Sequence, residues 1–215
     1  DVLSTRTNAS PPLHDHEIIA GDCPVVPYID VDWADPPAGT SPDAVLAAVR
    51  AFYVRVWNET YPSATIDDTA FLVATSTDPS GSKLSWHILV RPTDGDVLLP
   101  ANAQQQSFVR TLKQRMGEPR TTEERRWSDL TNAGAVIDGG VYGRDRSLRT
   151  IGSVKLCDRG RRGRVKRPAD EGVARPLEWY LVSYQRPDPT QLPVSFAAAA
   201  RPPRSFGTAG GGDAR

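Results

Sequence analysis

The sequence has little cysteine and no long apolar run. Its two cysteines, Cys23 and Cys157, are too few for a zinc site or a disulfide framework. A reducing compartment is therefore favoured, with a single bridge between the two cysteines as the alternative. No run of about 18 apolar residues occurs, so we expect no membrane span and an intracellular protein.

The sequence also lacks net charge, because 26 basic residues balance 26 acidic ones. Net charge therefore does not indicate a nucleic-acid-binding protein, and any basic site must be local. With 215 residues, 39% of them apolar, the chain predicts a soluble globular protein of one ordinary domain or two small ones. It begins with Asp1 rather than Met and shows no signal peptide, which favours a fragment of a longer protein.

Hydrophobic spacing predicts a mixture of strands and helices. Strands are expected over residues 25–33, 71–75, 83–90 and 177–184, with the middle two forming a hairpin. Helices are expected from the Ser41 cap to before Pro62, over 104–116, and from Thr121 to about Leu130. Residues 135–137 predict a buried strand that leads to Asp138.

The same pattern predicts three parts of the chain. Residues 1–24 are expected to be a flexible segment, in which the acidic and histidine residues 14–17 form a solvated loop rather than a metal site. Residues 25–185 form the folded core. Residues 186–215, rich in Pro, Ala and Gly, are expected to be disordered.

Two of the strands carry polar side chains on one face. Asp30 and Asp32 point the same way from their strand, and two adjacent carboxylates repel each other unless a cation lies between them. Lys83, Ser85 and His87 share one face of another strand, which is typical of an anion-binding surface. Each stretch alone also fits an ordinary half-exposed strand.

A third stretch joins an acid to several basic residues. Asp138 is followed by two glycines that permit a sharp turn, then by Arg146, Arg149 and Lys155. This combination fits a site that holds a metal and a polyphosphate together. Two metal ions about 4 Å apart can hold the attacking hydroxyl and the departing phosphate of a nucleotidyl transfer.

A basic run follows between residues 159 and 167. It favours contact with nucleic-acid phosphates, with a nuclear-import signal or a solvated loop as alternatives. Its members are Arg159, Arg161, Arg162, Arg164, Lys166 and Arg167.

In their order along the chain, the three polar stretches resemble the archaeo-eukaryotic primase superfamily, in the primase-polymerase (PrimPol) branch shared with herpesvirus primases. That family carries an acid-x-acid motif, a Ser-x-His motif and a hydrophobic-Asp motif that continues into Val-Tyr-x-x-x-Arg-x-x-Arg. Here they resemble residues 30–32, 85–87 and 137–149, and the resemblance covers about residues 25–156.

The resemblance implies an α+β (mixed α/β) primase catalytic core, with two α/β modules, an RRM-like antiparallel sheet and a central cleft. It implies two Mg²⁺ or Mn²⁺ ions held by Asp30, Asp32 and Asp138. The triphosphate would be held by Lys83, Ser85, His87, Arg146, Arg149 and Lys155.

The activity implied is that of a DNA primase or DNA-directed DNA polymerase, adding dNTPs, and often NTPs, along a single-stranded DNA template. Family members commonly carry a zinc module for starting primers, which two cysteines cannot build, so we expect no zinc in this chain, and whether it starts primers de novo stays open. The implied partners are a primer and template and a replicative helicase or single-strand-binding protein. The implied location is a nucleus, mitochondrion or viral replication compartment.

Two other functions remain open from the sequence. An acid-x-acid motif also suits a metal-dependent glycosyltransferase, although that activity leaves Lys83, Ser85, His87 and the arginines unexplained. The chain could instead be an inactive primase-like domain that only binds single-stranded DNA.

Overall fold

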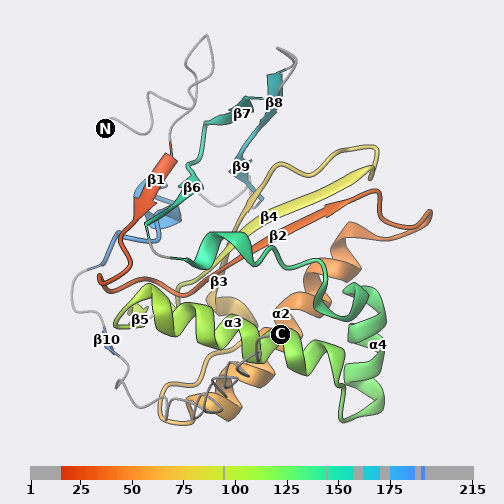
Figure 1. Cartoon of the computed structure of the whole chain (residues 1–215), viewed down its shortest axis with the longest axis horizontal. Helices are drawn as coiled ribbons and strands as arrows, with labels where there is room; N and C mark the ends of the chain where they lie inside the picture. The colour runs from red at the N-terminus through yellow and green to blue at the C-terminus, as the bar shows by residue number, and fades with distance from the viewer. Residues whose placement is uncertain are drawn as a thin grey trace, which may run out of the picture.

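The structure is a computed structural model (Figure 1). It describes residues 16–93, 95–143, 145–156, 162–169, 175–186 and 190–191. For residues 155–156, 162–163 and 190–191 only the backbone is described. Over these ranges it is a mixed α/β fold with antiparallel sheets and three α-helices.

The three helices are α2 (Pro42–Thr60), α3 (Asn102–Gly117) and α4 (Thr122–Leu130). All three confirm the helices predicted from spacing, and Ser41 caps α2 by accepting a hydrogen bond from the Ala44 amide at 3.3 Å. Tyr53 of α2 joins the layers, because its ring lies 4.9 Å from Phe108 of α3 and 5.6 Å from Phe71 of the sheet. Within the described ranges, none of these helices is long and apolar enough to cross a membrane.

The main sheet has four strands in the order β2-β4-β3-β9. They are β2 (Tyr28–Ala34), β4 (Lys83–Val90), β3 (Phe71–Thr75) and β9 (Arg167–Pro168), all paired antiparallel. A short 3₁₀ helix, η1 (Asp68–Ala70), leads into β3. The predicted strands over 25–33, 71–75 and 83–90, and the predicted hairpin, are confirmed.

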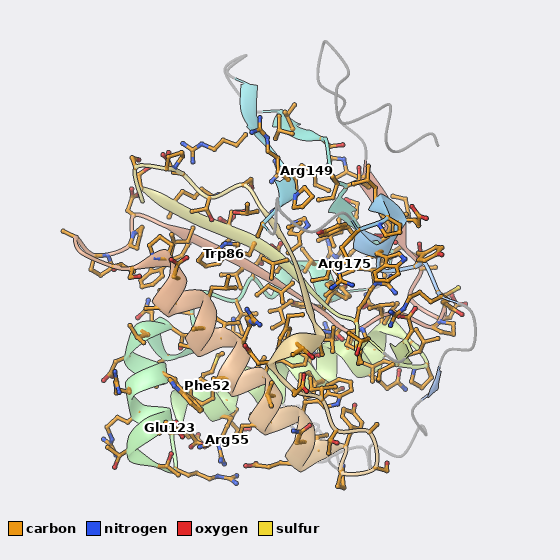
Figure 2. All side chains as sticks on the ribbon, turned by 180° about the vertical axis from the view of Figure 1, so that it is seen from behind. Phe52, Arg55, Trp86, Glu123, Arg149 and Arg175 are labelled. Carbon is orange, nitrogen blue, oxygen red and sulfur yellow. The ribbon has the colours of Figure 1, made fainter. Side chains whose placement is uncertain are left out.

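Three smaller strand pairs surround the main sheet. They are β1 (His16–Ile19) with β6 (Arg146–Arg149), β7 (Val154–Leu156) with β8 (Arg162–Val165), and β5 (Val97–Leu98) with β10 (Thr190–Gln191). Figure 1 shows the helices on one side of the main sheet and the β1–β6 and β7–β8 ribbons on the other. Figure 2 shows the same division, with Phe52 among the helices and Arg149 on the ribbon side.

The expected strand over 177–184 is wrong. Residues Leu177–Tyr180 form a 3₁₀ helix, η4, and the chain then runs on without joining the main sheet. The cause is Arg91, whose guanidinium donates to the backbone carbonyls of Trp179, Leu181 and Tyr184 at 2.5–2.7 Å. A side chain thus takes the acceptors that a neighbouring strand would have used.

The expected strand over 135–137 is also wrong. The 3₁₀ helix η2 (Asn132–Gly134) leads into a segment that makes only one isolated bridge, between Ile137 and Val31. Positive φ angles of 48° at Asn132 and 49° at Ala133 turn the chain just before this point. Val136 and Ile137 are buried as expected, but along the edge of β2 rather than in a strand of their own.

The terminal segments also differ from the prediction. Residues 1–15 lie outside the described residues, but residues 16–19 form strand β1 rather than a flexible loop. The carboxylate of Glu17 accepts from the Val182 amide at 2.8 Å and the Ser183 amide at 2.5 Å, which ties β1 to the end of the core. Of the predicted tail, Arg186 and the β10 backbone are described, and the rest lies outside the described residues.

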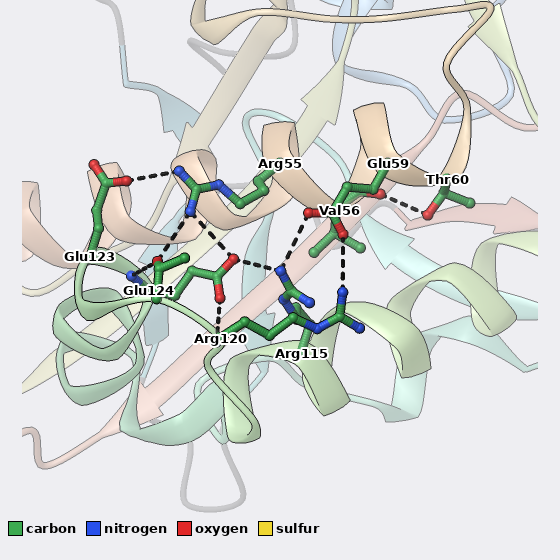
Figure 3. Close-up of polar contacts among 9 residues, drawn as sticks. Arg55, Val56, Glu59, Thr60, Arg115, Arg120, Glu123 and Glu124 are labelled. Atoms are coloured by element: carbon green, nitrogen blue, oxygen red, sulfur yellow. Dashed lines mark hydrogen bonds and ion pairs between the residues drawn. The ribbon is translucent and has the colours of Figure 1, made fainter.

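An ionic network joins α2, α3 and α4 (Figure 3). Its centre is Glu124, whose carboxylate accepts from Arg115 at 2.7 Å, from Arg55 at 3.3 Å and from the Arg120 amide at 2.6 Å. The Glu124 side chain is fully buried, whereas that of the neighbouring Glu123 is 60% exposed. Burial opposes ionisation of Glu124, but the hydrogen bonds and charges of Arg115 and Arg55 outweigh it and hold the pKa of Glu124 below its usual range.

We expect Glu124→Gln to lower the free energy of unfolding by about 2–4 kcal/mol, because it removes the carboxylate that compensates a buried arginine. The matched control Glu123→Gln removes a surface partner of Arg55 and should change the free energy of unfolding by less than about 1 kcal/mol. Urea denaturation of both variants measures the difference.

The loss of stability caused by Glu124→Gln should depend on pH. A lowered pKa means that Glu124 contributes stability above the pKa of the unfolded chain, and that this contribution is lost as the pH falls through the folded-state pKa. The wild type and Glu124→Gln should therefore converge in acid. Equal losses for the two variants at neutral pH would contradict the assigned role of Glu124.

Candidate active site

The register between β2 and β4 brings the first two polar stretches together. Asp30 lies opposite His87, and Asp32 lies opposite Ser85, in one antiparallel ladder. Directly opposed residues point to the same face of a sheet, so both carboxylates share a face with Ser85 and His87. The two motifs therefore form one polar surface, on the side of the sheet away from the helices.

This surface is the floor of a cavity of about 620 Å³, a size that suits a small-molecule ligand. From the sheet side the cavity is lined by Asp30, Asp32, Ser76, Lys83, Ser85 and His87. From the ribbon side it is lined by His16, Ser147, Arg149 and Arg164, with Asp138 at the edge of β2.

Asp138 reaches the cavity through backbone pairing with β2. The Asp138 amide donates to the Asp30 carbonyl at 2.9 Å, and the Asp32 amide donates to the Val136 carbonyl at 2.9 Å. The predicted turn after Asp138 is the 3₁₀ helix η3 (Gly140–Tyr142), and the Gly140 amide donates to Asp138 Oδ1 at 2.7 Å. A Cβ at Gly140 would lie 3.1 Å from the same oxygen, so this approach favours glycine.

Tyr142 explains why the third motif contains a tyrosine. Its buried hydroxyl accepts a hydrogen bond from the Asp30 amide at 2.8 Å. Tyr28 makes the reciprocal contact, since its hydroxyl donates to the Val141 carbonyl at 3.0 Å. The segment after Asp138 is thus fixed against the strand that carries Asp30.

Burial dominates the electrostatics of Asp30, which is 9% exposed. Burial raises the pKa of Asp30 to about 6; the charge of Lys166 opposes this shift, and Asp138 and Asp32 add to it. Asp32 is more exposed and forms an ion pair of 2.6 Å with Lys83. The face therefore holds acids close enough to repel one another, with basic groups between them.

His87 is held neutral by its surroundings. Burial lowers the pKa of His87 well below its usual value, and the charges of Lys166 and Arg149 lower it further. Its Nε2 atom lies 3.6 Å from Asp30 Oδ1, beyond a normal hydrogen bond. A neutral imidazole can donate from one nitrogen and accept at the other, which suits the binding of a polar ligand.

The structure places some of the predicted anion-binding residues at the cavity and others away from it. Lys83, Ser85, His87 and Arg149 all line the cavity. Arg146, an exposed residue at the start of the same strand as Arg149, does not. Its guanidinium lies against Gly143, where a Cβ would be only 2.8 Å from Arg146 Nε. The backbone of Lys155 lies in β7, and its side chain is outside the described part of the structure.

The structure describes part of the predicted basic run. Arg164 is exposed, lines the cavity and pairs with Asp78, and Arg167 is exposed in β9. Lys166 is fully buried beside the site. Arg159 and Arg161 lie outside the described residues, and so does the side chain of Arg162. Among the described side chains only Lys166 is withdrawn from the surface, and contact of the run with DNA stays a prediction.

Sequence patterns did not assign two residues of the site to it. His16 lines the cavity because β1 pairs with β6 and places it opposite Arg149, although residues 14–17 were expected to be a solvated loop. Lys166 was assigned to DNA contact, yet its side chain is buried and donates from Nζ to Ser85 Oγ at 3.3 Å. Long-range pairing brings both residues to the site, and local sequence patterns do not report such pairing.

The carboxylates of the cavity are suitable ligands for a hard divalent cation, since Mg²⁺ and Mn²⁺ prefer oxygen ligands. Asp30, Asp32 and Asp138 all face one cavity. Within the described residues, however, no three acids or histidines are close enough to form a ready ligand cluster. Metal binding at Asp32 would require its carboxylate to exchange the ammonium of Lys83 for the ion.

Acids, neutral imidazole, hydroxyl and guanidinium groups thus surround a single open cavity. Such a site can bind a phosphorylated ligand through its basic groups and a cation through its acids. A comparison with models of known protein families and with curated proteins finds no match for this chain. Inferences about its function therefore depend on the geometry of the site and on the motifs that resemble those of the primase-polymerases.

Proposed function

We propose that this chain is the catalytic core of a template-dependent nucleotidyltransferase, a DNA primase or polymerase of the primase-polymerase type. One observation carries the proposal: Asp30, Asp32 and Asp138 line the same cavity as Lys83 and Arg149. These residues come from three stretches that lie far apart in the sequence, at 30–32, at 83 and at 138–149. The acids match the metal half of a metal and triphosphate site, and the basic residues match the triphosphate half. The finer fold assignment, a primase core with an RRM-like sheet and a template cleft, belongs to the same proposal.

In this function the basic side chains bind the incoming nucleotide. Lys83 and Arg149 donate to phosphate oxygens, and the Ser85 hydroxyl and neutral His87 complete the polar contacts. When Asp32 releases Lys83, the freed ammonium lies at the edge of the cavity, ready to contact the triphosphate. Arg164, paired with Asp78, closes the ribbon side.

The acids hold the cations that the reaction requires. Two Mg²⁺ or Mn²⁺ ions at Asp30, Asp32 and Asp138 would activate the primer hydroxyl and stabilise charge on the phosphates. Tyr142 and the Gly140 amide keep Asp30 and Asp138 in place for this role. A single-stranded DNA template, a primer and dNTPs are the proposed partners, with a helicase or single-strand-binding protein as a further one.

A glycosyltransferase is less well supported by the geometry. A nucleotide-sugar enzyme needs metal-binding acids, but it gives no role to the three-residue polar face of β4 or to Arg149. An inactive DNA-binding domain is likewise less well supported, because pure binding of a polyanion does not require three carboxylates on one cavity.

We expect the wild type to extend a labelled primer on a longer DNA template with dNTPs and either Mg²⁺ or Mn²⁺. Asp30→Asn with Asp32→Asn should reduce extension by at least about a thousandfold, because the proposed ligands of the metals are lost. Asp129→Asn, an exposed acid on α4, serves as the matched control and should extend normally.

Either of two results would contradict the polymerase proposal. Extension by the double variant at the wild-type rate would show that these acids are not the catalytic ones. Binding of single-stranded DNA by folded wild type with no extension under either metal would favour the inactive binding domain.

Metal binding is testable without turnover. We expect Mn²⁺, at about ten times its dissociation constant, to raise the melting temperature of the wild type by about 3–6 °C, since binding to the folded state alone adds about 1.4 kcal/mol. The Asp30→Asn/Asp32→Asn variant should show no such rise, whereas Asp129→Asn should match the wild type. An equal rise in all three proteins would place the metal elsewhere.

A further inference from the structure

Lys166 is the least expected residue of the molecule, because its side chain is fully buried. It lies between β8 and β9, where its amide donates to the Ser153 carbonyl at 3.0 Å and its carbonyl accepts from the Gly152 amide at 2.9 Å. These backbone bonds fix the point from which the side chain enters the interior. A buried amine is costly unless it has partners, which indicates that this one has a role.

The Lys166 amine donates a hydrogen bond to a residue of the proposed nucleotide site. Lys166 Nζ donates to Ser85 Oγ at 3.3 Å. Lys166 itself does not line the cavity, so it does not touch a ligand there. Any influence on the ligand must pass through Ser85 or through the electric field at the nearby acids.

Ser85 receives a second hydrogen bond from its other side. Arg149 Nη2 donates to Ser76 Oγ at 3.1 Å, and Ser76 Oγ donates to Ser85 Oγ at 3.1 Å. Since a guanidinium only donates, Ser76 accepts from Arg149 and turns its own proton toward Ser85. Two basic side chains thus direct hydrogen bonds to one oxygen, Lys166 directly and Arg149 through Ser76.

A serine hydroxyl has two acceptor positions and one donor. Lys166 and Ser76 donate to both acceptor positions of Ser85 Oγ. The hydroxyl can then make a further hydrogen bond only by donating its own O–H. The Ser85 backbone is fixed as well, because its amide donates to Thr77 Oγ1 at 2.9 Å and its carbonyl accepts from the Ser76 amide at 2.9 Å. The free O–H belongs to a residue that lines the cavity.

We propose that Lys166 and Ser76 are positioning residues that commit the Ser85 hydroxyl to donate a hydrogen bond into the cavity. This inference rests on the proposed function, and it assigns the atom that Ser85 meets as an anionic phosphate oxygen of the bound nucleotide. A ligand group that must itself donate a proton at this position is rejected, because Ser85 has no acceptor left. Polarisation along Arg149, Ser76 and Ser85 strengthens the final hydrogen bond.

A double-mutant cycle on dTTP binding tests the proposal with the full chain. The dissociation constant for dTTP with Mg²⁺, in the absence of primer, is measured for wild type, Lys166→Met, Ser85→Ala and the double variant. We expect Lys166→Met to weaken binding about tenfold in the wild type, but less than about twofold when Ser85 is already Ala. A purely structural role of Lys166 would weaken binding equally in both backgrounds.

Ser76→Ala provides the second variant, in case Lys166→Met fails to fold. It should also weaken dTTP binding about tenfold in the wild type and have little effect beside Ser85→Ala. Ser107→Ala, a serine of α3 away from the cavity, is the matched control and should bind dTTP as the wild type does.

The outcomes are distinguishable. Equal losses in both backgrounds, or unchanged binding by Lys166→Met and Ser76→Ala, would overturn the positioning role while leaving the proposed function in place. Failure of the folded wild type to bind dTTP at all would overturn the proposed function and the positioning role together.

Discussion

The antiparallel register between β2 and β4 is the constraint on which the rest of the site depends. It sets Asp30 opposite His87 and Asp32 opposite Ser85, so one ladder defines the polar floor of the cavity. A shift by one residue would turn both acids toward the helices, into the face that apolar core residues fill. The core enforces this register, because Val31 and Ile88 fill the face beneath and are fully buried.

The polar face of the sheet also holds several buried ionisable groups, which are unfavourable for the stability of the fold. Asp30, His87 and Lys166 lie largely buried within one small region, where Lys166 lowers the pKa of both Asp30 and His87 and Asp30 raises that of Lys166. Burial lowers the pKa of Lys166 to about 7, although the negative charge of the Asp30 carboxylate acts in the opposite direction and raises this pKa. Such unfavourable groups persist where binding requires them, which is why a cluster of shifted pKa values indicates a functional site.

Long-range contacts place the remaining parts of the site. Glu17 ties β1 to the end of the core, and β1 in turn pairs with β6, which carries Arg149. Arg91, bonded to Asp96 at 2.7 Å, holds the segment after residue 177 and so supports the backbone that Glu17 contacts. Residues at both ends of the described chain therefore help to fix a guanidinium in the cavity.

The sequence by itself determined the three helices, the β3–β4 hairpin and the shared faces of Asp30 with Asp32 and of Ser85 with His87. These features follow from local periodicity and capping, which the sequence displays directly. Only the tertiary structure decided that Arg146 lies outside the cavity lining, that the Lys166 amine contacts Ser85, and that His16 joins the cavity. Those positions depend on which distant strands pair and on where Arg91 takes backbone acceptors, and neither leaves a local pattern in the sequence.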